Sequence, residues 1–220
     1  MYNDIAEIKK LILKSNTSIV GIVCKDGVVI GGDRRATAGT IIMSKKEKKV
    51  VNINEYIVVA GTGVASDIDL SKRIFGAELK LKELRSKTRP TIREAATLFG
   101  MITYRSIRTP SMVPSIVGML VAGFNEDGSV ELYTVEPAGG VYKVEDYDAN
   151  FSSGMPYILG LLERQWKKDM TIQQGVDLAV EALKSSIQRD VGSGNGIDVF
   201  TITKDGIKQV ISQEITPTYK

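Results

Sequence analysis

Three side chains that could support hydrolysis lie within the first fifty residues: Thr17, Asp33 and Lys49. A threonine hydroxyl is a weak nucleophile, and it needs a neighbouring base or a lowered pKa to react. Each residue also has an ordinary structural explanation. Threonine is common at strand edges, an aspartate before Arg34 and Arg35 can form surface ion pairs, and a lysine in a basic run can lie on a solvated turn. The chemical interpretation therefore requires the three residues to meet.

The amino-acid composition narrows the chemistry further. The 220 residues include no histidine and a single cysteine, Cys24. Ser-His-Asp and Cys-His mechanisms, histidine metal sites and a disulfide within the chain are therefore excluded. The acidic loop of calcium-binding proteins is also missing, so we expect no metal and no other cofactor. Cys24 is interpreted as a small core residue.

The charge and hydropathy of the chain argue against nucleic acid and membrane partners. The net charge is +3, and no basic stripe with interleaved aromatic residues is present. No apolar run approaches the ~18–20 residues of a membrane span. Residues 1–16 do not form a secretory signal, because Asp4 and Glu7 precede the lysines and no small-residue cleavage site follows. We therefore expect a cytoplasmic location.

The segment around the candidate residues predicts a β-hairpin. Apolar runs over Ser18–Cys24 and Val28–Asp33 flank Asp26 and Gly27, and Asp-Gly is a common pair in two-residue turns. This turn predicts that Asp33 lies about three positions, or ~10 Å, from the open end of the hairpin at Thr17.

The rest of the chain groups strands and pairs of helices. Further strands are expected over 41–44 and 49–53, paired around a turn at 45–48, and over 56–60, 115–122, 130–135, 141–144, 196–203 and 207–212. One helix pair is expected after Ser66 and Thr91, and another over 156–166 and 171–187. Thr91 with Glu94, and Thr171 with Gln174, have the spacing of capping boxes. The first helix is expected to bury one regularly spaced face, Leu70, Ile74, Ala77, Leu81 and Leu84.

This grouping predicts an α+β fold rather than a doubly wound parallel sheet, in which strands and helices alternate singly. The strands are apolar on both faces, which suits two antiparallel sheets stacked between helix pairs in a four-layer αββα sandwich. We find no internal repeat and no linker between domains.

Two glycine-rich segments resemble nucleotide-binding loops only weakly. Gly61-Thr62-Gly63 follows a strand, but Ser66 replaces the third glycine of a dinucleotide fingerprint. The segment 192–196 lacks the lysine of a phosphate-binding loop and precedes a strand, so a turn explains it better.

Taken together, a set of motifs resembles the proteasome β subunits, most closely the archaeal type. The motifs are TSIVGIVCKDGVVIGGDRRATAG from Thr17, KK at 48–49, AGTG at 60–63, SSGMP at 152–156, GVDLAVEAL at 175–183 and QRDVGSGNGIDV at 188–199. The family belongs to the N-terminal-nucleophile (Ntn) hydrolases. The resemblance implies a propeptide over residues 1–16 and a single Ntn-hydrolase domain over residues 17–220.

The resemblance also implies the roles of individual residues. Thr17 would be the nucleophile once residues 1–16 are removed by autocatalytic cleavage between Asn16 and Thr17, with the freed α-amine as the base. Asp33 and Lys49 would be the charged pair beside it. Ser153, Asp190 and Ser193 would orient the amine, and the backbone N–H of Gly63 would be the oxyanion donor. The residues expected to bind substrate are Ala36, Thr37, Val51, Gly61 and Ala65. Ala36, Val51, Gly61 and Ala65 would form a pocket for large hydrophobic side chains, and Glu47 and Asp69 at its rim could admit basic ones.

Asn16 departs from the family, whose usual residue before the nucleophile is glycine. Two functions therefore stay open. One is a threonine endopeptidase that degrades unfolded proteins inside a closed chamber, and the other is an unprocessed, non-catalytic subunit of the same ring. The resemblance implies seven-membered rings of β subunits, flanking α subunits and ATP-dependent unfoldase caps as partners.

Overall fold

The computed structural model describes residues 16–215. The predicted propeptide, apart from Asn16, lies outside the described residues. The elements, in chain order, are β1 (Ile19–Cys24), β2 (Gly27–Asp33), β3 (Ala36–Ala38), β4 (Ile41–Ser44), β5 (Val50–Asn52), β6 (Ile57–Gly63), α2 (Ala65–Ser86), α3 (Ile92–Arg108), β7 (Val117–Phe124), β8 (Val130–Val135), β9 (Val141–Lys143), β10 (Tyr147–Asp148), α4 (Met155–Gln165), α5 (Ile172–Ile187), β11 (Gly196–Thr203) and β12 (Gly206–Glu214).

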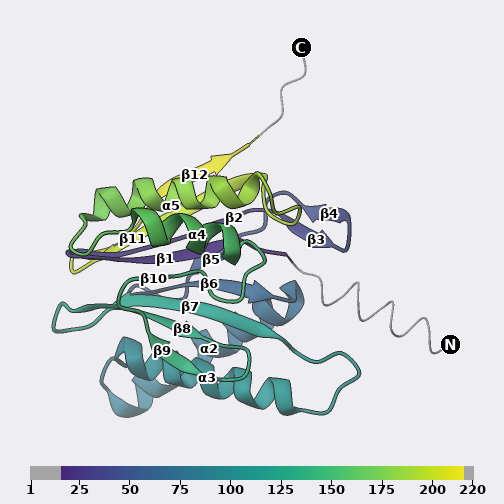
Figure 1. Ribbon diagram of the computed structural model, residues 1–220. Helices are drawn as coiled ribbons and strands as arrows, with labels where there is room; N and C mark the ends of the chain where they lie inside the picture. Colours follow the sequence, from purple (N-terminus) through teal and green to yellow (C-terminus); the bar gives the residue numbers. More distant parts are fainter. Residues whose placement is uncertain (1–15, 216–220) are drawn as a thin grey trace.

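The strands form two five-stranded sheets and a small hairpin. The first sheet has the order β10-β1-β2-β11-β12, the second has the order β5-β6-β7-β8-β9, and β3 pairs with β4. The neighbouring strands pair antiparallel. In Figure 1, α4 and α5 cover the outer face of the first sheet, and α2 and α3 cover the outer face of the second. The predicted four-layer α+β sandwich is confirmed.

Three apolar cores hold the four layers together. One lies between the first sheet and α4–α5, where Ile22, Leu162 and Leu183 are buried. A second lies between the second sheet and α2–α3, where the Phe75 and Phe99 rings meet edge to face with centroids 5.3 Å apart. The third lies between the two sheets. The central strands β2, β6, β7 and β11 are therefore buried on both faces, which explains why they lack a clear polar and apolar alternation.

The hairpin of β1 and β2 has a different register from the predicted one. Cys24 pairs with Gly27, so Lys25 and Asp26 form the turn. Gly27 is needed for packing instead, since a Cβ there would lie 2.2 Å from the carbonyl oxygen of Ile202 on β11. In the observed register the Asp33 N–H donates to the Ser18 carbonyl oxygen at 3.0 Å. Asp33 is thus next to the start of β1, closer to Thr17 than the sequence predicted.

The predicted pairing of the strands at 41–44 and 49–53 is wrong. β4 pairs with β3, whereas β5 pairs with β6 in the second sheet. Val50 of β5 is buried between the two sheets, while Ile41 and Met43 of β4 are 65% and 69% exposed. Burial of β5 therefore separates it from β4.

The buried face of α2 also differs from the prediction. Ile68, Phe75 and Leu79 are its buried apolar residues. Most of the face predicted from spacing is exposed instead, with Leu70 at 51% and Leu84 at 64%. The helix has apolar residues on more than one side, and the contact of Phe75 with α3 decides which side turns inward. Its N-cap is Val64, which makes no side-chain cap, rather than the predicted Ser66.

Several local predictions are confirmed. Thr91 with Glu94 and Thr171 with Gln174 form complete capping boxes at the starts of α3 and α5. Cys24 packs in the core beneath α4–α5, and burial, together with the nearby charge of Asp26, raises its pKa to about 12.

None of the helices described between residues 16 and 215 has both the length and the hydropathy of a membrane span.

Candidate active site

The fold brings the six predicted catalytic residues to one end of the sandwich. Thr17 lies two residues before the start of β1, Asp33 ends β2, and Lys49 directly precedes β5. Ser153 lies just before α4, and Asp190 and Ser193 lie in the connection from α5 to β11. The site therefore combines residues from both sheets and from the loops at either end of the α4–α5 layer. Thr17 itself is only 2% exposed.

Lys49 and Asp33 form a buried ion pair beside Thr17. The Lys49 Nζ lies 2.6 Å from Asp33 Oδ1 and 3.3 Å from the carbonyl oxygen of Asn16. The Asp33 carboxylate also accepts the backbone N–H groups of Ser18 at 2.9 Å, Arg35 at 2.9 Å and Gly194 at 2.8 Å. Both side chains are thereby fixed in place, and a positive charge points at the peptide bond between Asn16 and Thr17.

Burial controls the acidity of Lys49. Desolvation lowers the pKa of its ammonium below that of an exposed lysine, and the adjacent carboxylate of Asp33 opposes this shift. A lysine with a lowered pKa releases its proton more readily.

A second hydrogen-bond network holds the nitrogen of Thr17. The Thr17 N–H donates to Ser153 Oγ at 2.8 Å, and the Ser153 hydroxyl lies 2.6 Å from Asp190 Oδ2. The Ser193 hydroxyl donates to the same Asp190 oxygen at 2.6 Å. The peptide bond between Asn16 and Thr17 is thus contacted on its carbonyl side by Lys49 and on its N–H side by Ser153.

Sequence reasoning missed three residues that complete these networks. Ser18 Oγ lies 2.5 Å from Ser186 Oγ and 2.7 Å from Ser193 Oγ, which links α5 to the start of β1. The Arg35 guanidinium binds the Val191 carbonyl oxygen at 2.7 Å. Serines beside a catalytic residue and arginines after an aspartate carry no distinctive pattern, so no signal in the sequence singled them out.

A small pocket opens beside Thr17. It is lined by Thr17, Arg35, Ala36, Glu47, Lys48, Lys49, Gly61, Ala65, Ile68 and Lys72. Ala36, Gly61 and Ala65, three of the predicted substrate-binding residues, are thus brought together, with Ile68 as an additional apolar wall. Asp69, expected at the rim, forms an exposed ion pair with Arg73 at 3.1 Å.

Three other residues predicted to contact substrate do not line the pocket beside Thr17. Among residues 16–215, Thr37, Val51 and Gly63 are not part of the lining of this pocket. Val51 packs against the core under α2 and α3. Gly63 ends β6 with φ of 121°, and a Cβ there would lie 2.0 Å from the Ile116 carbonyl oxygen, so only glycine fits. The roles of Thr37, Val51 and Gly63 stay predictions.

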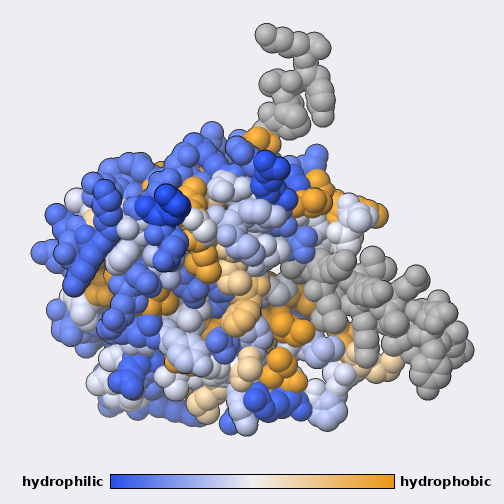
Figure 2. Space-filling view, in the orientation of Figure 1, coloured by the Kyte–Doolittle hydropathy of each residue, from blue (hydrophilic) through white to orange (hydrophobic). Residues whose placement is uncertain are grey.

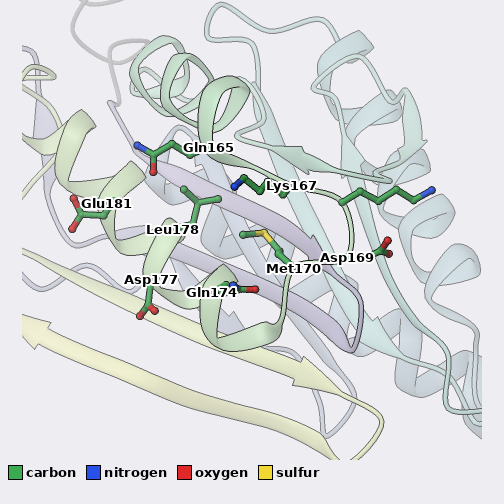
Figure 3. Close-up of a pocket in the computed structure, with 9 residues that line it drawn as sticks. Gln165, Lys167, Asp169, Met170, Gln174, Asp177, Leu178 and Glu181 are labelled. Carbon is green, nitrogen blue, oxygen red and sulfur yellow. The ribbon is translucent and has the colours of Figure 1, made fainter.

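A separate depression lies on the α4–α5 layer (Figure 3). It is lined by Gln165, Lys167, Lys168, Asp169, Met170, Gln174, Asp177, Leu178 and Glu181. Its charged groups have both signs, and Met170 and Leu178 at its base belong to the core beneath. None of the predicted catalytic residues in the described part of the chain lines it, so it is not the candidate site.

Within residues 16–215, no group of three or more acidic, cysteine or histidine side chains is placed to hold a metal ion. The acidic residues at the site contact lysine, serine hydroxyls and backbone N–H groups instead.

Comparison with known proteins identifies the family. The family model described as "Proteasome subunit" matches residues 13–202. The chain belongs to the proteasome subunit family. The β subunit of the proteasome from Nanoarchaeum equitans is 37% identical over 88% of this chain and 96% of its own. The corresponding protein from Archaeoglobus profundus is 36% identical over 96% and 95%, and β subunit 2 from Pyrococcus abyssi is 37% identical over 90% and 92%.

Membership of this family confirms the resemblance drawn from the motifs. The chain is a subunit of the proteasome core particle, it assembles with other proteasome subunits, and the particle it helps to build is a protease. The four-layer arrangement is consistent with the Ntn-hydrolase sandwich.

Proposed function

We propose that this proteasome subunit is a threonine endopeptidase whose nucleophile is Thr17. The observation that carries the proposal is the convergence on Thr17 of two networks, the buried ion pair of Lys49 with Asp33 and the partly buried pair of Ser153 with Asp190. A structural threonine at a strand edge would not need a buried ion pair on one side and a carboxylate-linked serine on the other. Buried charges are costly unless paired, and such arrangements concentrate at functional sites.

The first step would be autocatalytic removal of residues 1–16. The Thr17 hydroxyl attacks the Asn16 carbonyl carbon, the bond to the Thr17 nitrogen breaks, and the hydroxyl proton ends on that nitrogen. Lys49 Nζ, 3.3 Å from the Asn16 carbonyl oxygen, stabilises the negative charge that develops there. Water then hydrolyses the ester, which leaves a carboxylate on Asn16 and a free amine on Thr17.

In the processed subunit, the Thr17 amine would act as the base in peptide hydrolysis. An unperturbed α-amine has a pKa of about 7.7–8.0, so it can accept the hydroxyl proton near neutral pH. The Thr17 oxygen attacks the substrate carbonyl, the proton passes to the leaving amine, and water hydrolyses the resulting ester. Ser153 and Asp190 orient the amine, while Lys49 polarises the hydroxyl. Gly63 N–H is proposed as the oxyanion donor.

We propose that substrates are extended, unfolded chains. Backbone pairing with the segments around Thr37 and Gly61–Gly63 would bind a chain without reading its side chains. The apolar lining at Ala36, Ala65 and Ile68 favours a large hydrophobic side chain before the cleaved bond. Glu47, which lines the same pocket, would allow some cleavage after basic residues.

Assembly would confine this activity to a chamber. We propose seven-membered β rings flanked by α subunits and served by ATP-dependent unfoldase caps in the cytoplasm. Exposed apolar residues support extensive contacts with neighbouring subunits, because large apolar patches on a protein surface usually mark interfaces. They include Ile41 and Met43 on β4 and Leu70 and Leu84 on α2. Figure 2 shows apolar surface at the β3–β4 hairpin, at the upper right of the molecule.

One observation favours the second candidate, a non-catalytic structural subunit. Asn16 stands where the family usually has glycine, and without cleavage the Thr17 nitrogen stays an amide that cannot act as a base.

The proposed function is tested with particles assembled from this chain and a partner α subunit. We expect them to hydrolyse a denatured, fluorescently labelled protein and to leave the same protein intact when it is folded, because a closed chamber admits only unfolded chains. Peptide products sequenced by mass spectrometry should show large hydrophobic residues before the cleaved bonds. Particles that assemble fully and cleave neither form would support the structural alternative.

A further inference from the structure

Asn16 and Gly192 lie against each other at the candidate site. A Cβ built on Gly192 would lie 1.7 Å from the Asn16 Cβ and 2.4 Å from both Cγ and Nδ2 of Asn16. Real side chains do not approach so closely, so a side chain at 192 and the present position of Asn16 exclude each other.

The backbone conformation does not explain the glycine at 192. Gly192 is absent from the residues of the described chain that have positive φ, whereas Gly194 and Gly196 have φ of 151° and 149°. The backbone at 192 therefore does not have the left-handed φ that favours glycine over alanine. What Gly192 provides is space, and Asn16 fills it.

The loop around Gly192 is held on both sides and cannot easily move away. The Arg35 guanidinium binds the Val191 carbonyl oxygen at 2.7 Å and Asn195 Oδ1 at 2.8 Å. The Gly194 N–H donates to Asp33 at 2.8 Å. An added methyl group at 192 would therefore displace Asn16 rather than the loop.

Displacement of Asn16 would act directly on the scissile bond. The Asn16 carbonyl oxygen is the group that Lys49 Nζ contacts at 3.3 Å, and the Thr17 N–H of the same peptide bond donates to Ser153 Oγ. These contacts set the position of the Asn16 carbonyl group, which the Thr17 hydroxyl must reach in the proposed cleavage. A residue larger than glycine before the nucleophile keeps this geometry only if its side chain has somewhere to go.

We propose that Gly192 is the positioning residue that admits Asn16 before the nucleophile and so allows the chain to cleave itself. The missing Cβ at 192 compensates for the Cβ that Asn16 adds where the family usually has glycine. The inference rests on the proposed function, since it assigns Gly192 a part in the maturation of Thr17. It also removes the main argument for the non-catalytic alternative, because Asn16 no longer stands in an unsuitable site.

The test compares the maturation rate of full-length chains in assembling particles, followed by intact mass. We expect Gly192→Ala to slow the loss of residues 1–16 about a hundredfold, because misplacing a reacting group by about 1 Å costs roughly that much in rate. Gly160→Ala is the matched control, since a Cβ there meets no atom within 4 Å, and it should mature at the parent rate. The double variant Asn16→Gly, Gly192→Ala should recover the parent rate, a rescue that a general folding defect would not give.

A second measurement separates maturation from catalysis. A Gly192→Ala chain that starts at Thr17, released by cleavage of an N-terminal fusion, should hydrolyse peptides as the parent does. Three results would each overturn the role of Gly192. The first is that the Gly192→Ala chain starting at Thr17 is inactive, and the second is that the Gly192→Ala precursor matures at the parent rate. The third is that the double variant matures as slowly as the single one. If the parent precursor itself keeps residues 1–16 in assembled particles, the proposed function fails, and the role of Gly192 in maturation fails with it.

Discussion

Replacing Thr17 with alanine is expected to abolish peptide hydrolysis while particles of normal size still form. The substitution removes the only oxygen proposed to attack the substrate, and loss of a catalytic nucleophile lowers turnover by a factor on the order of 10⁴ or more. The same variant should keep residues 1–16, because self-cleavage uses the same hydroxyl. Hydrolysis of a fluorogenic peptide, gel filtration and intact mass measure the three effects.

Two control variants make this result specific. Thr17→Ser keeps a hydroxyl on the same carbon and should retain both self-cleavage and hydrolysis. Thr97→Ala removes an exposed hydroxyl on α3, where the group bonds only within its own helix, and should leave activity unchanged. Undiminished hydrolysis by Thr17→Ala would show that the nucleophile lies elsewhere.

Removing the Asp33 carboxylate is expected to damage both stability and activity. Asp33→Ala leaves the Lys49 ammonium buried without its partner and takes the acceptor from the N–H groups of Ser18, Arg35 and Gly194. Breaking a buried ion pair by deleting one partner typically costs ~3–5 kcal/mol. We expect a fall of that size in the free energy of unfolding, measured with denaturant, together with loss of peptide hydrolysis.

A paired substitution separates the two consequences. Asp33→Asn combined with Lys49→Met removes both charges, so much of the stability should return while hydrolysis stays absent. Asp69→Asn is the surface control: its pair with Arg73 is exposed, and such pairs contribute ~0–1 kcal/mol. If Asp33→Ala lowers the free energy of unfolding no more than Asp69→Asn does, the ion pair of Lys49 and Asp33 does not stabilise the fold.

Much of the fold could be predicted from local patterns. The capping boxes at Thr91 and Thr171 fix where two helices begin, because their partners lie three residues away in the sequence. The grouping of strands and helices indicated two antiparallel sheets between helix layers, and this arrangement is observed. Features that depend on residues close together in the chain could thus be predicted from the sequence.

Features that depend on contacts between residues far apart in the chain could not be predicted from the sequence. Gly27 was assigned to a turn, but its glycine is required by the carbonyl of Ile202, far along the chain. The inward face of α2 is decided by the contact of Phe75 with Phe99, not by the spacing of its leucines.

The same limit applies to the site. Thr17, Asp33 and Lys49 were identifiable as candidates, but only the resemblance to a family linked them to Ser153 and Asp190. The fit of Asn16 against Gly192 joins positions that are close only in the folded chain. The sequence shows that Asn16 departs from the family, but it does not show that the side chain of Asn16 occupies the space beside Gly192.

The central claim is that Thr17 becomes the N-terminal residue of the working subunit. The most direct measurement is the intact mass of this chain taken from assembled particles. We predict a mass that corresponds to a chain starting at Thr17, with residues 1–16 removed and a free amine on the nucleophile. A full-length mass in fully assembled particles would contradict it and would assign the subunit a structural role in the ring.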